Sequence, residues 1–266
     1  MDKYDLSDVT FIIPLRIDSE ARLDNINTVL KFLTKYLDTH FILFEADSTQ
    51  KASALANYSG VNYYFFEDNN LYFHHSHYRN EMIKLSQTSV VSIWDADIIS
   101  PIDQILEAVN VIRQKKAILS YPYDGNCYNL PEKASLKFKD TLDIFFLKNI
   151  KSKIPQLYGL LANGGALFVN KRIYMKLGME NEHIIGWGPE DSERLKRITI
   201  LDYPVYRVSG AIYHLFHPRL NTSRPISEEI QRKNLKEFLK ICSFSEKELI
   251  TEIESWKWVK EKIVPL

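Results

Sequence analysis

The chain contains few cysteines and glycines, no long hydrophobic run and no excess of charge of either sign. Cys127 and Cys242 are its only cysteines, too few for a disulfide framework or, by themselves, a zinc cluster, and they suit a reducing compartment. The 34 basic residues equal the 34 acidic ones. A nucleic-acid-binding protein is therefore disfavoured, because it would need a basic surface. No apolar run approaches about 18 residues, so we expect no membrane-spanning segment.

The 266 residues suit one large domain or two small ones. Hydrophobic residues make up 45% and charged residues 26%, as is typical of a folded globular protein. The first residues are charged and have no apolar stretch, so we expect no signal peptide. The chain is accordingly predicted to be cytoplasmic, and peripheral contact with the inner face of the cell membrane is left open. We predict one α/β domain over residues 1–226 and a helical extension over 227–266 that packs on it.

Strand and helix patterns alternate in the first half of the chain. Strands are predicted at residues 9–15, 41–44, 62–66, 90–94 and 117–121, and helices at 23–37, 76–87 and from a Ser100 N-cap to about 112. The second half is less regular, with a helix at 136–150, a strand at 166–169, a helix at 189–198, a strand region at 203–215 and amphipathic tail helices. The order predicts a doubly wound, mostly parallel sheet with helices on both faces.

Polar side chains follow several of these strands. Open parallel sheets bind ligands at the carboxyl ends of their strands. This rule predicts that one rim of the sheet carries Arg16, Asp18, Asp47, Asp95 and Asp97.

Asp95, Ala96 and Asp97 directly follow the buried run at 90–94. In an extended chain the two carboxylates point to the same side and repel each other unless a cation or a proton intervenes. A divalent metal that presents a nucleotide diphosphate would resolve this repulsion. The alternative is a solvated turn whose acids cap the helix after Ser100.

Arg16 and Asp18 follow the first strand. The arginine could hold a phosphate or pack on a base, and the carboxylate could accept a hydrogen bond from a ribose or a uracil. For this segment alone, an exposed ion pair is the better interpretation.

The segment 185–191 places Trp187 between two glycines, followed by Pro189, Glu190 and Asp191 at a helix start. One interpretation makes the tryptophan a stacking wall for a sugar ring and one acid a general base. The other makes Trp187 a core residue and the acids partners of the helix dipole. A helix start also lowers a carboxylate pKa, which weakens a base unless burial compensates.

Taken together, these segments resemble the GT-A glycosyltransferases. They resemble in particular the galactosyltransferase and N-acetylgalactosaminyltransferase group, which includes animal β-1,4-galactosyltransferases and bacterial chondroitin polymerase. Over about residues 9–217 the shared elements are, in order, the strand end 13–16, Arg79-Asn80, Asp95 to Asp97, Gly164-Gly165, Gly186 to Asp191, and His214. The resemblance implies that residues 1–226 form a GT-A domain.

The resemblance also implies roles for individual residues. The residues that would contact the nucleotide sugar are Pro14, Arg16, Asp18, Asp47, Arg79, Asp95, Ala96, Gly165 and Trp187. The metal ligands would be Asp97 and His214, with Asp95 near the metal or the ribose and His217 as the rival histidine. An imidazole beside carboxylate oxygen favours Mn²⁺ over Mg²⁺. Asp191 would be the catalytic base, and Glu190 would hold an acceptor hydroxyl.

The implied activity is metal-dependent, inverting transfer of a hexose, with galactose or N-acetylgalactosamine favoured, from a UDP-sugar to a glycan or glycolipid hydroxyl. A retaining UDP-sugar transferase and a non-catalytic sugar-nucleotide or glycan-binding module remain the alternatives. Several features depart from the family pattern. Pro189 stands where many animal members carry glycine, Ser192 follows where those members continue with acids, and the cluster His74-His75-Ser76-His77 has no counterpart. We favour a packed or solvated loop for this cluster over a second metal site, because such tight spacing rarely closes a tetrahedron.

Overall fold

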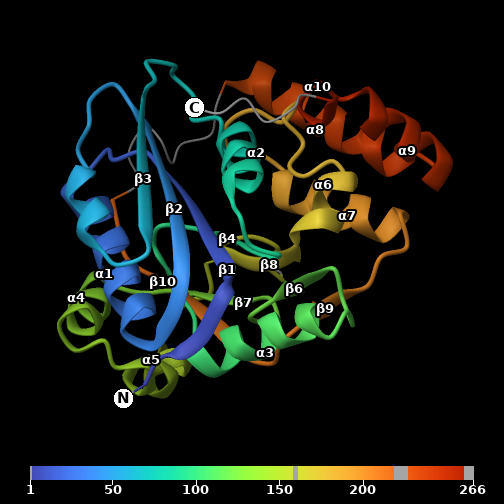
Figure 1. Ribbon diagram of the computed structural model, residues 1–266. Coiled ribbons are helices and arrows are strands. Elements are labelled where there is room, and N and C mark those ends of the chain that lie inside the picture. Colours follow the sequence, from blue (N-terminus) through green and yellow to red (C-terminus); the bar gives the residue numbers. More distant parts are fainter. Residues whose placement is uncertain (1, 158–160, 219–226, 261–266) are drawn as a thin grey trace.

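The computed structural model describes residues 2–157, 161–218 and 227–260. A seven-stranded sheet with the order β3-β2-β1-β4-β8-β6-β9 forms its centre (Figure 1). The strands are β1 (Tyr4–Leu15), β2 (Leu37–Asp47), β3 (Val61–Glu67), β4 (Val90–Trp94), β6 (Leu119–Tyr121), β8 (Ala166–Asn170) and β9 (Val205–Arg207). The β3-β2-β1-β4 half is parallel, whereas β8 runs antiparallel to both β4 and β6. The predicted mostly parallel sheet is confirmed.

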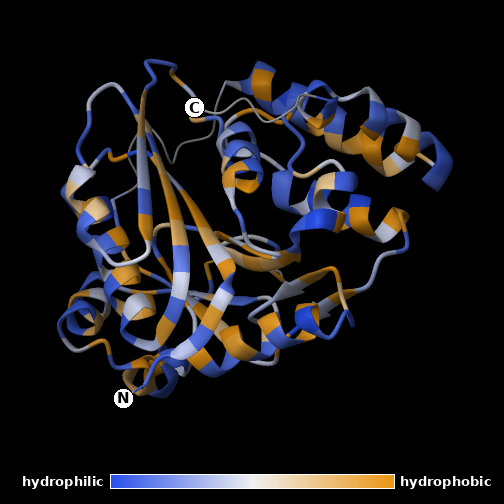
Figure 2. Ribbon diagram, in the orientation of Figure 1, coloured by the Kyte–Doolittle hydropathy of each residue, from blue (hydrophilic) through white to orange (hydrophobic). Residues whose placement is uncertain are grey.

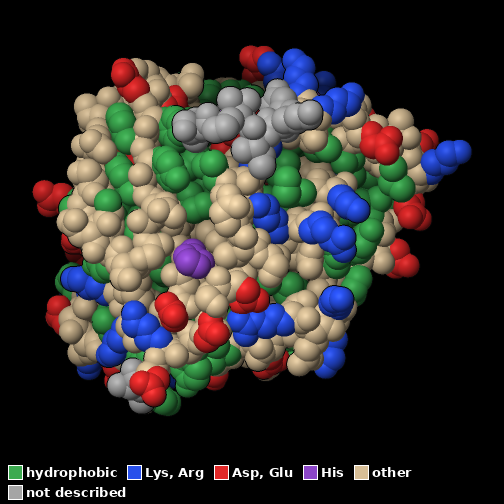
Figure 3. Space-filling view, viewed as in Figure 1, with side chains coloured by type: hydrophobic (Ala, Val, Ile, Leu, Met, Phe, Trp, Pro, Cys, Tyr) green, Lys and Arg blue, Asp and Glu red, His purple; other side chains and the backbone are tan. Residues whose placement is uncertain are grey.

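The middle of the sheet is covered on both faces. Residues 9–15 of β1 are all buried, although successive side chains of a strand point to opposite faces. On one face, the ring of Phe11 lies 5.4 Å from that of Phe41, 5.3 Å from Trp94 and 5.7 Å from Phe168. These contacts join four neighbouring strands, and Figure 2 shows hydrophobic residues concentrated along the strands. On the surface, acidic and basic side chains are interspersed along the lower edge of the face in Figure 3.

The helices of the first half agree with the sequence pattern to within a few residues. They are α1 (Glu20–Tyr36), α2 (His75–Leu85) and α3 (Ile102–Arg113), with a short 3-10 helix η1 (Ser53–Asn57). Pro101, not Ser100, occupies the N-cap position of α3. The predicted Ser100 cap is wrong, because this buried hydroxyl faces the carbonyls of Pro101 and Pro122, each 3.5 Å away.

Two predicted elements of the second half are divided in the structure. The helix expected at 136–150 is α4 (Glu132–Thr141) and α5 (Ile144–Ile150), followed by η2 (Lys151–Lys153), because Leu142 adopts a left-handed conformation and Asp143 caps α5. The strand region expected at 203–215 is β9 and β10 (Ala211–His214), separated by Gly210 at φ +119. β10 belongs to a second sheet, β5-β10-β7, with β5 (Ile98–Ile99) and β7 (Asn126–Asn129).

The remaining helices lie together (Figure 1): α6 (Lys171–Lys176), α7 (Glu190–Ile200), α8 (Glu228–Ser243), α9 (Glu246–Ser255) and α10 (Lys257–Lys260). The predicted capping box of Ser245 and Glu248 opens α9. The indole N–H of Trp258 donates to the Gly178 carbonyl at 3.0 Å, and Trp256 is buried against Gly178. The tail helices thus pack on the α6–α7 region. Across the described ranges, every helix is too short or too polar to cross a membrane.

Candidate functional site

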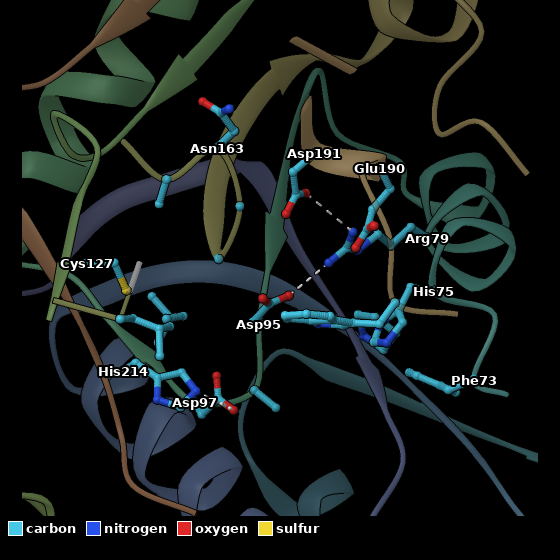
Figure 4. A pocket seen from close by; sticks show the side chains of 18 of the residues that line it. Phe73, His75, Arg79, Asp95, Asp97, Cys127, Asn163, Glu190, Asp191 and His214 are labelled. Atoms are coloured by element: carbon cyan, nitrogen blue, oxygen red, sulfur yellow. Dashed lines mark hydrogen bonds and ion pairs between the residues drawn. The ribbon is translucent and has the colours of Figure 1, made fainter. Parts of the chain in front are cut away.

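A cavity of about 360 Å³ opens at the carboxyl ends of β1 and β4. Its walls come from segments that are distant in the sequence: 14–17, 95–98, 161–165, 187–192 and 214–217. Figure 4 shows Asp95, Asp97, Asp191 and His214 around this space. The cavity therefore lies where a doubly wound sheet is expected to bind ligands.

Asp97, His214 and His217 converge in the cavity. The Asp97 Oδ2 atom lies 3.5 Å from the Nε2 atom of His214 and 3.3 Å from that of His217. All three potential ligand atoms fall within 4.8 Å of one another. The two histidines that the sequence left as rivals thus lie together, and this set of one carboxylate and two imidazoles suits a divalent transition metal.

The other nitrogens of both imidazoles have acceptors. His217 Nδ1 lies 2.9 Å from the Pro218 carbonyl, and His214 Nδ1 lies 3.0 Å from Asn129 Oδ1. A carbonyl can only accept, so His217 donates from Nδ1, and its Nε2 atom is the one that faces Asp97. Burial opposes ionisation of Asp97, but the two histidines hold its pKa well below the usual range. The carboxylate is thus ionised and ready to bind a cation.

The second sheet holds these residues together. β10 pairs with β5 so that His214 lies opposite Ile98, next to Asp97. The backbone N–H of Leu215 donates to the Asp97 carbonyl at 2.8 Å. The buried side chain of Asn25 donates to the Phe216 carbonyl at 3.2 Å. The turn after β4 and the segment after β10 are therefore fixed to each other.

Asp95 has a different partner. Its Oδ1 atom accepts from Nη2 of Arg79 at 2.9 Å, and it lies outside the group formed by Asp97 and the two histidines. The structure thus pairs Asp95 with Arg79 and does not bring it into the metal-ligating set where the sequence also placed it. Its side chain remains 39% exposed in the cavity. Removal from bulk water, opposed by Arg79, raises the pKa of Asp95 to about 6.

Three predicted rim residues make contacts within the protein. The Arg16 guanidinium donates to the carbonyls of Ala46 at 2.8 Å and Asn70 at 2.9 Å, and it pairs with Asp68. Asp47 accepts from the Ile17 N–H at 3.1 Å and from Lys51 at 2.9 Å. Asp18 pairs with Arg22 at 3.0 Å.

Of these rim residues, Arg16 lines the cavity, while Asp18 and Asp47 are not among the described residues that do. The other predicted nucleotide-sugar residues, Pro14, Arg79, Asp95, Ala96, Gly165 and Trp187, all line it. Trp187 is 44% exposed, so it forms part of the cavity wall and is not a core residue.

Asp191 lies at the start of α7 with its two oxygens in different surroundings. Oδ1 accepts from Nη2 of Arg194 at 2.8 Å. Oδ2 lies against Gly164, where a Cβ atom would overlap it. The Gly164 carbonyl is held by the hydroxyl of Tyr123 at 2.5 Å. A side chain at position 164 would therefore push the Asp191 carboxylate out of its place.

We predict that Gly164→Ala displaces the Asp191 carboxylate and lowers the transfer rate by about 10- to 100-fold, because small misplacements of reacting groups are costly. The thermal midpoint should change little, since Asp191 is 32% exposed and can move. Steady-state kinetics in the wild-type and Asp191→Asn backgrounds check this. An equal loss in both backgrounds would contradict the prediction, because the alanine would then act without Asp191.

Glu190 lies beneath Asp191 and is only 9% exposed. Its Oε2 atom accepts from the Gly188 N–H at 3.0 Å, which closes the glycine-tryptophan turn. Burial and the neighbouring Asp191 raise the pKa of Glu190 to about 8. A carboxyl group that stays protonated near neutrality can donate a hydrogen bond, and it favours the folded state at low pH.

Protonated Glu190 should therefore stabilise the folded state at low pH, and this contribution should be lost as the pH rises from the ordinary carboxyl value of 4.5 to about 8. The contribution falls across this window because the native state binds the extra proton. In Glu190→Gln this part of the decline should disappear. Thermal unfolding from pH 5 to 8 without metal measures both proteins, and parallel curves would refute this assignment.

The histidine cluster at 74–77 makes structural contacts. His77 Nδ1 lies 3.0 Å from Glu182 Oε2, and His74 Nε2 lies 3.1 Å from the Glu182 carbonyl. Neither histidine belongs to a metal-ligating group among the described residues. The cluster is thus held by contacts within the protein, but the expected loop is wrong, because His74 is the N-cap residue of α2 and the other three residues form its first turn.

Sequence reasoning missed several residues at the site. Phe73, Asn25 and Asn163 line the cavity from loops and from α1, and no motif marks them. His75 lines it from α2, although the histidine cluster was expected to form a packed or solvated loop. Glu180 and Arg194 form a buried ion pair directly behind Asp191. Charged residues on a helix, such as Arg194, or in a loop, such as Glu180, are normally exposed, so the sequence alone gave no signal for this pair.

Comparison with known proteins identifies the family. The family profile described as "Glycosyltransferase like family 2" matches residues 10–240. No curated protein sequence matches the chain significantly. Several solved structures resemble this chain in fold. Their sequence identities to it are low, so the likeness supports the fold alone.

Glucosyl-3-phosphoglycerate synthase from Mycobacterium tuberculosis, solved with Mn²⁺, UDP and glucosyl-3-phosphoglycerate, has a TM-score of 0.54 and 14% identity over 89% of this chain and 80% of that one. Mannosyltransferase PcManGT from Pyrobaculum calidifontis, solved with GDP-Man and Mn²⁺, has a TM-score of 0.54 and 15% identity over 80% and 58%.

The catalytic domain of Drosophila β1,4galactosyltransferase 7, solved with xylobiose, has a TM-score of 0.50 and 14% identity over 95% and 83%. These neighbours confirm the expected GT-A fold. Membership of the galactosyltransferase group stays a prediction, because the structures that resemble this chain also include a glucosyl-3-phosphoglycerate synthase and a mannosyltransferase. With its profile match over most of its length, the chain belongs to the family 2-like glycosyltransferases.

Proposed function

We propose that the protein transfers a hexose from a UDP-sugar to a hydroxyl group of a glycan or glycolipid, with inversion at the anomeric carbon. One observation carries the proposal: the cavity holds a carboxylate at Asp191 and, apart from it, a cation-ligating set of Asp97, His214 and His217. In Figure 4, Asp191 lies in the upper part of the view and Asp97 in the lower part, with Asp95 between them. Inversion requires a base on the face opposite the leaving group.

The ligand atoms of Asp97, His214 and His217 fit a divalent metal. One carboxylate oxygen and two imidazole nitrogens, each directed by a hydrogen bond on its far side, favour Mn²⁺ over Mg²⁺. A bound metal would offset the charge that develops on the UDP leaving group. Neighbours in the fold were solved with Mn²⁺ and with UDP or GDP-Man, which supports a nucleotide-sugar donor.

The remaining roles follow from position. Asp191 takes the proton of the acceptor hydroxyl through Oδ2, since Oδ1 is occupied by Arg194. Glu190, protonated near neutrality, holds the acceptor by donating a hydrogen bond. Trp187 stacks on a sugar ring at the cavity mouth. Arg79, which is buried, donates a hydrogen bond to Asp95 and so orients Asp95 toward the bound donor.

Galactose and N-acetylgalactosamine are our first choices for the transferred sugar. The test is a donor panel of UDP-galactose, UDP-N-acetylgalactosamine, UDP-glucose and GDP-mannose with Mn²⁺, scored by nucleotide release. The anomeric configuration of the product is then read by NMR. Inversion with a UDP-sugar supports the proposal. Retention would replace it with the retaining alternative, and UDP binding without turnover of any donor would favour a binding module.

A further inference from the structure

A line of five charged side chains runs behind the cavity wall from Asp95 to Asp191. Arg79 Nη2 lies 2.9 Å from Asp95, and Arg79 Nη1 lies 3.6 Å from Glu180 Oε2. Arg194 completes the line: its Nη2 lies 2.8 Å from both Glu180 Oε2 and Asp191 Oδ1. Arg79 Nη1 also lies 4.0 Å from Asp191 Oδ1, so the line closes on itself, and Figure 4 shows the dashes from Arg79 to Asp95 and Asp191. One carboxylate, Glu180, thus sits between two arginines, each of which holds an acid of the cavity.

Glu180 is set deep in the protein. Its side chain is 1% exposed, and so is that of Arg194. Burial alone would raise the pKa of Glu180, but Arg194 and Arg79 bring it down to about 2. The Tyr174 hydroxyl also donates to Oε1. A buried charge held by this many partners has one stable geometry, because losing any partner leaves an uncompensated charge.

The backbone of Glu180 is fixed as firmly as its side chain. Its N–H donates to Asn80 Oδ1 at 2.8 Å, and its carbonyl accepts from Asn80 Nδ2 at 2.9 Å. Asn80 is the neighbour of Arg79 on α2, whereas Arg194 and Asp191 belong to α7. Glu180 therefore connects the helix that holds Asp95 to the helix that carries Asp191.

We propose that Glu180 is a positioning residue for catalysis: by orienting Arg79 and Arg194 together, it fixes the Asp191 carboxylate relative to the donor side of the cavity. Arg194 occupies Oδ1 of Asp191 and so leaves Oδ2 as the acceptor that faces Gly164. Preorganisation of this kind acts on the rate of the chemical step more than on donor binding. The inference rests on the proposed role of Asp191 as base.

The same helix offers a matched control. Arg197 and Glu193 form an ion pair at 2.8 Å with exposures of 0% and 1%, as deep as the pair of Arg194 and Glu180. Neither Glu193 nor Arg197 lines the cavity among the described residues. Neutralising Glu193 should therefore remove a comparable buried charge without reaching Asp191.

The experiment compares Glu180→Gln with Glu193→Gln in the full chain, by thermal unfolding and by steady-state kinetics with the donor that the wild type uses. Both variants should lose thermal stability. Glu180→Gln should lower kcat by about 100-fold with the donor KM within about twofold of wild type, as expected for a base displaced by about 1 Å. Glu193→Gln should keep the wild-type kcat.

If Glu180→Gln does not fold, Arg194→Lys is the second test. Lysine keeps the positive charge but lacks the guanidinium group that contacts both Glu180 and Asp191. This variant should show the same loss of kcat with an unchanged donor KM. A wild-type kcat in the folded Glu180 or Arg194 variant overturns the positioning role, as does an equal kcat loss in Glu193→Gln. These outcomes leave the proposed function intact if Asp191→Asn is inactive. Wild-type transfer that survives Asp191→Asn, or no wild-type transfer at all, overturns both proposals.

Discussion

Asp191→Asn is expected to lower kcat by about 1,000-fold, in the range that general-base catalysis contributes. Asparagine keeps the shape of the side chain and an oxygen for the 2.8 Å contact with Arg194. It cannot accept a proton from an acceptor hydroxyl at neutral pH. The loss should therefore appear in kcat, while the affinity for UDP with Mn²⁺ stays near that of the wild type, because the contact with Arg194 keeps the cavity wall in place.

The measurement is a single-turnover transfer assay, combined with UDP binding by calorimetry. Asp191→Glu is a useful companion, because it keeps a base but pushes it against Gly164. A transfer rate for Asp191→Asn within about threefold of wild type, far from the 100- to 10,000-fold that a general base contributes, would show that another group takes the proton.

Asp97→Ala should abolish metal binding at the site and transfer with it. Removing even an outer hydrogen-bond partner of a metal ligand costs about 10- to 100-fold in metal affinity, so the loss of the only carboxylate in the group should exceed 100-fold. The two histidines would remain, 5.1 Å apart between ring centroids. Free Mn²⁺ measured by electron paramagnetic resonance reports the affinity directly, with no need for turnover.

The matched control is His183→Ala. Within the described part of the chain, the other group with metal-ligating spacing is His183, Glu237 and Glu252. Lys240 already neutralises that group, with its Nζ 2.6 Å from Glu252 and 3.8 Å from Glu237. The control variant should bind Mn²⁺ as the wild type does. Retained Mn²⁺ affinity in Asp97→Ala, or its loss in His183→Ala, would reverse the assignment of the site.

The central strands were predictable because their residues are almost all hydrophobic. The run at 90–94 is β4 to the residue, since every side chain in it is buried. β1 and β2 extend beyond the predictions through polar residues such as Asp5, Ser7 and Asp47. Polar ends of strands carry no hydrophobic pattern, so the rim was harder to place than the core.

The site was predictable where one short segment carried the chemistry. Asp97 follows a buried strand and was expected at the rim, whereas Asp191 was identified through the motif at 186–191 and the family resemblance that it supports. The convergence of His214 and His217 on Asp97 depends on the small β5-β10-β7 sheet, for which the sequence had no signal. Glu180 and Arg194 were missed for the same reason, because only tertiary pairing turns two charged residues into a buried pair.

The most direct test is a crystal structure with Mn²⁺ and UDP, using the anomalous signal of manganese to locate the ion. We predict one manganese peak bound by Asp97 Oδ2 and the Nε2 atoms of His214 and His217, with the UDP diphosphate beside it in the cavity and Asp191 across from it. Manganese bound elsewhere, or UDP outside this cavity, would contradict the proposed enzyme.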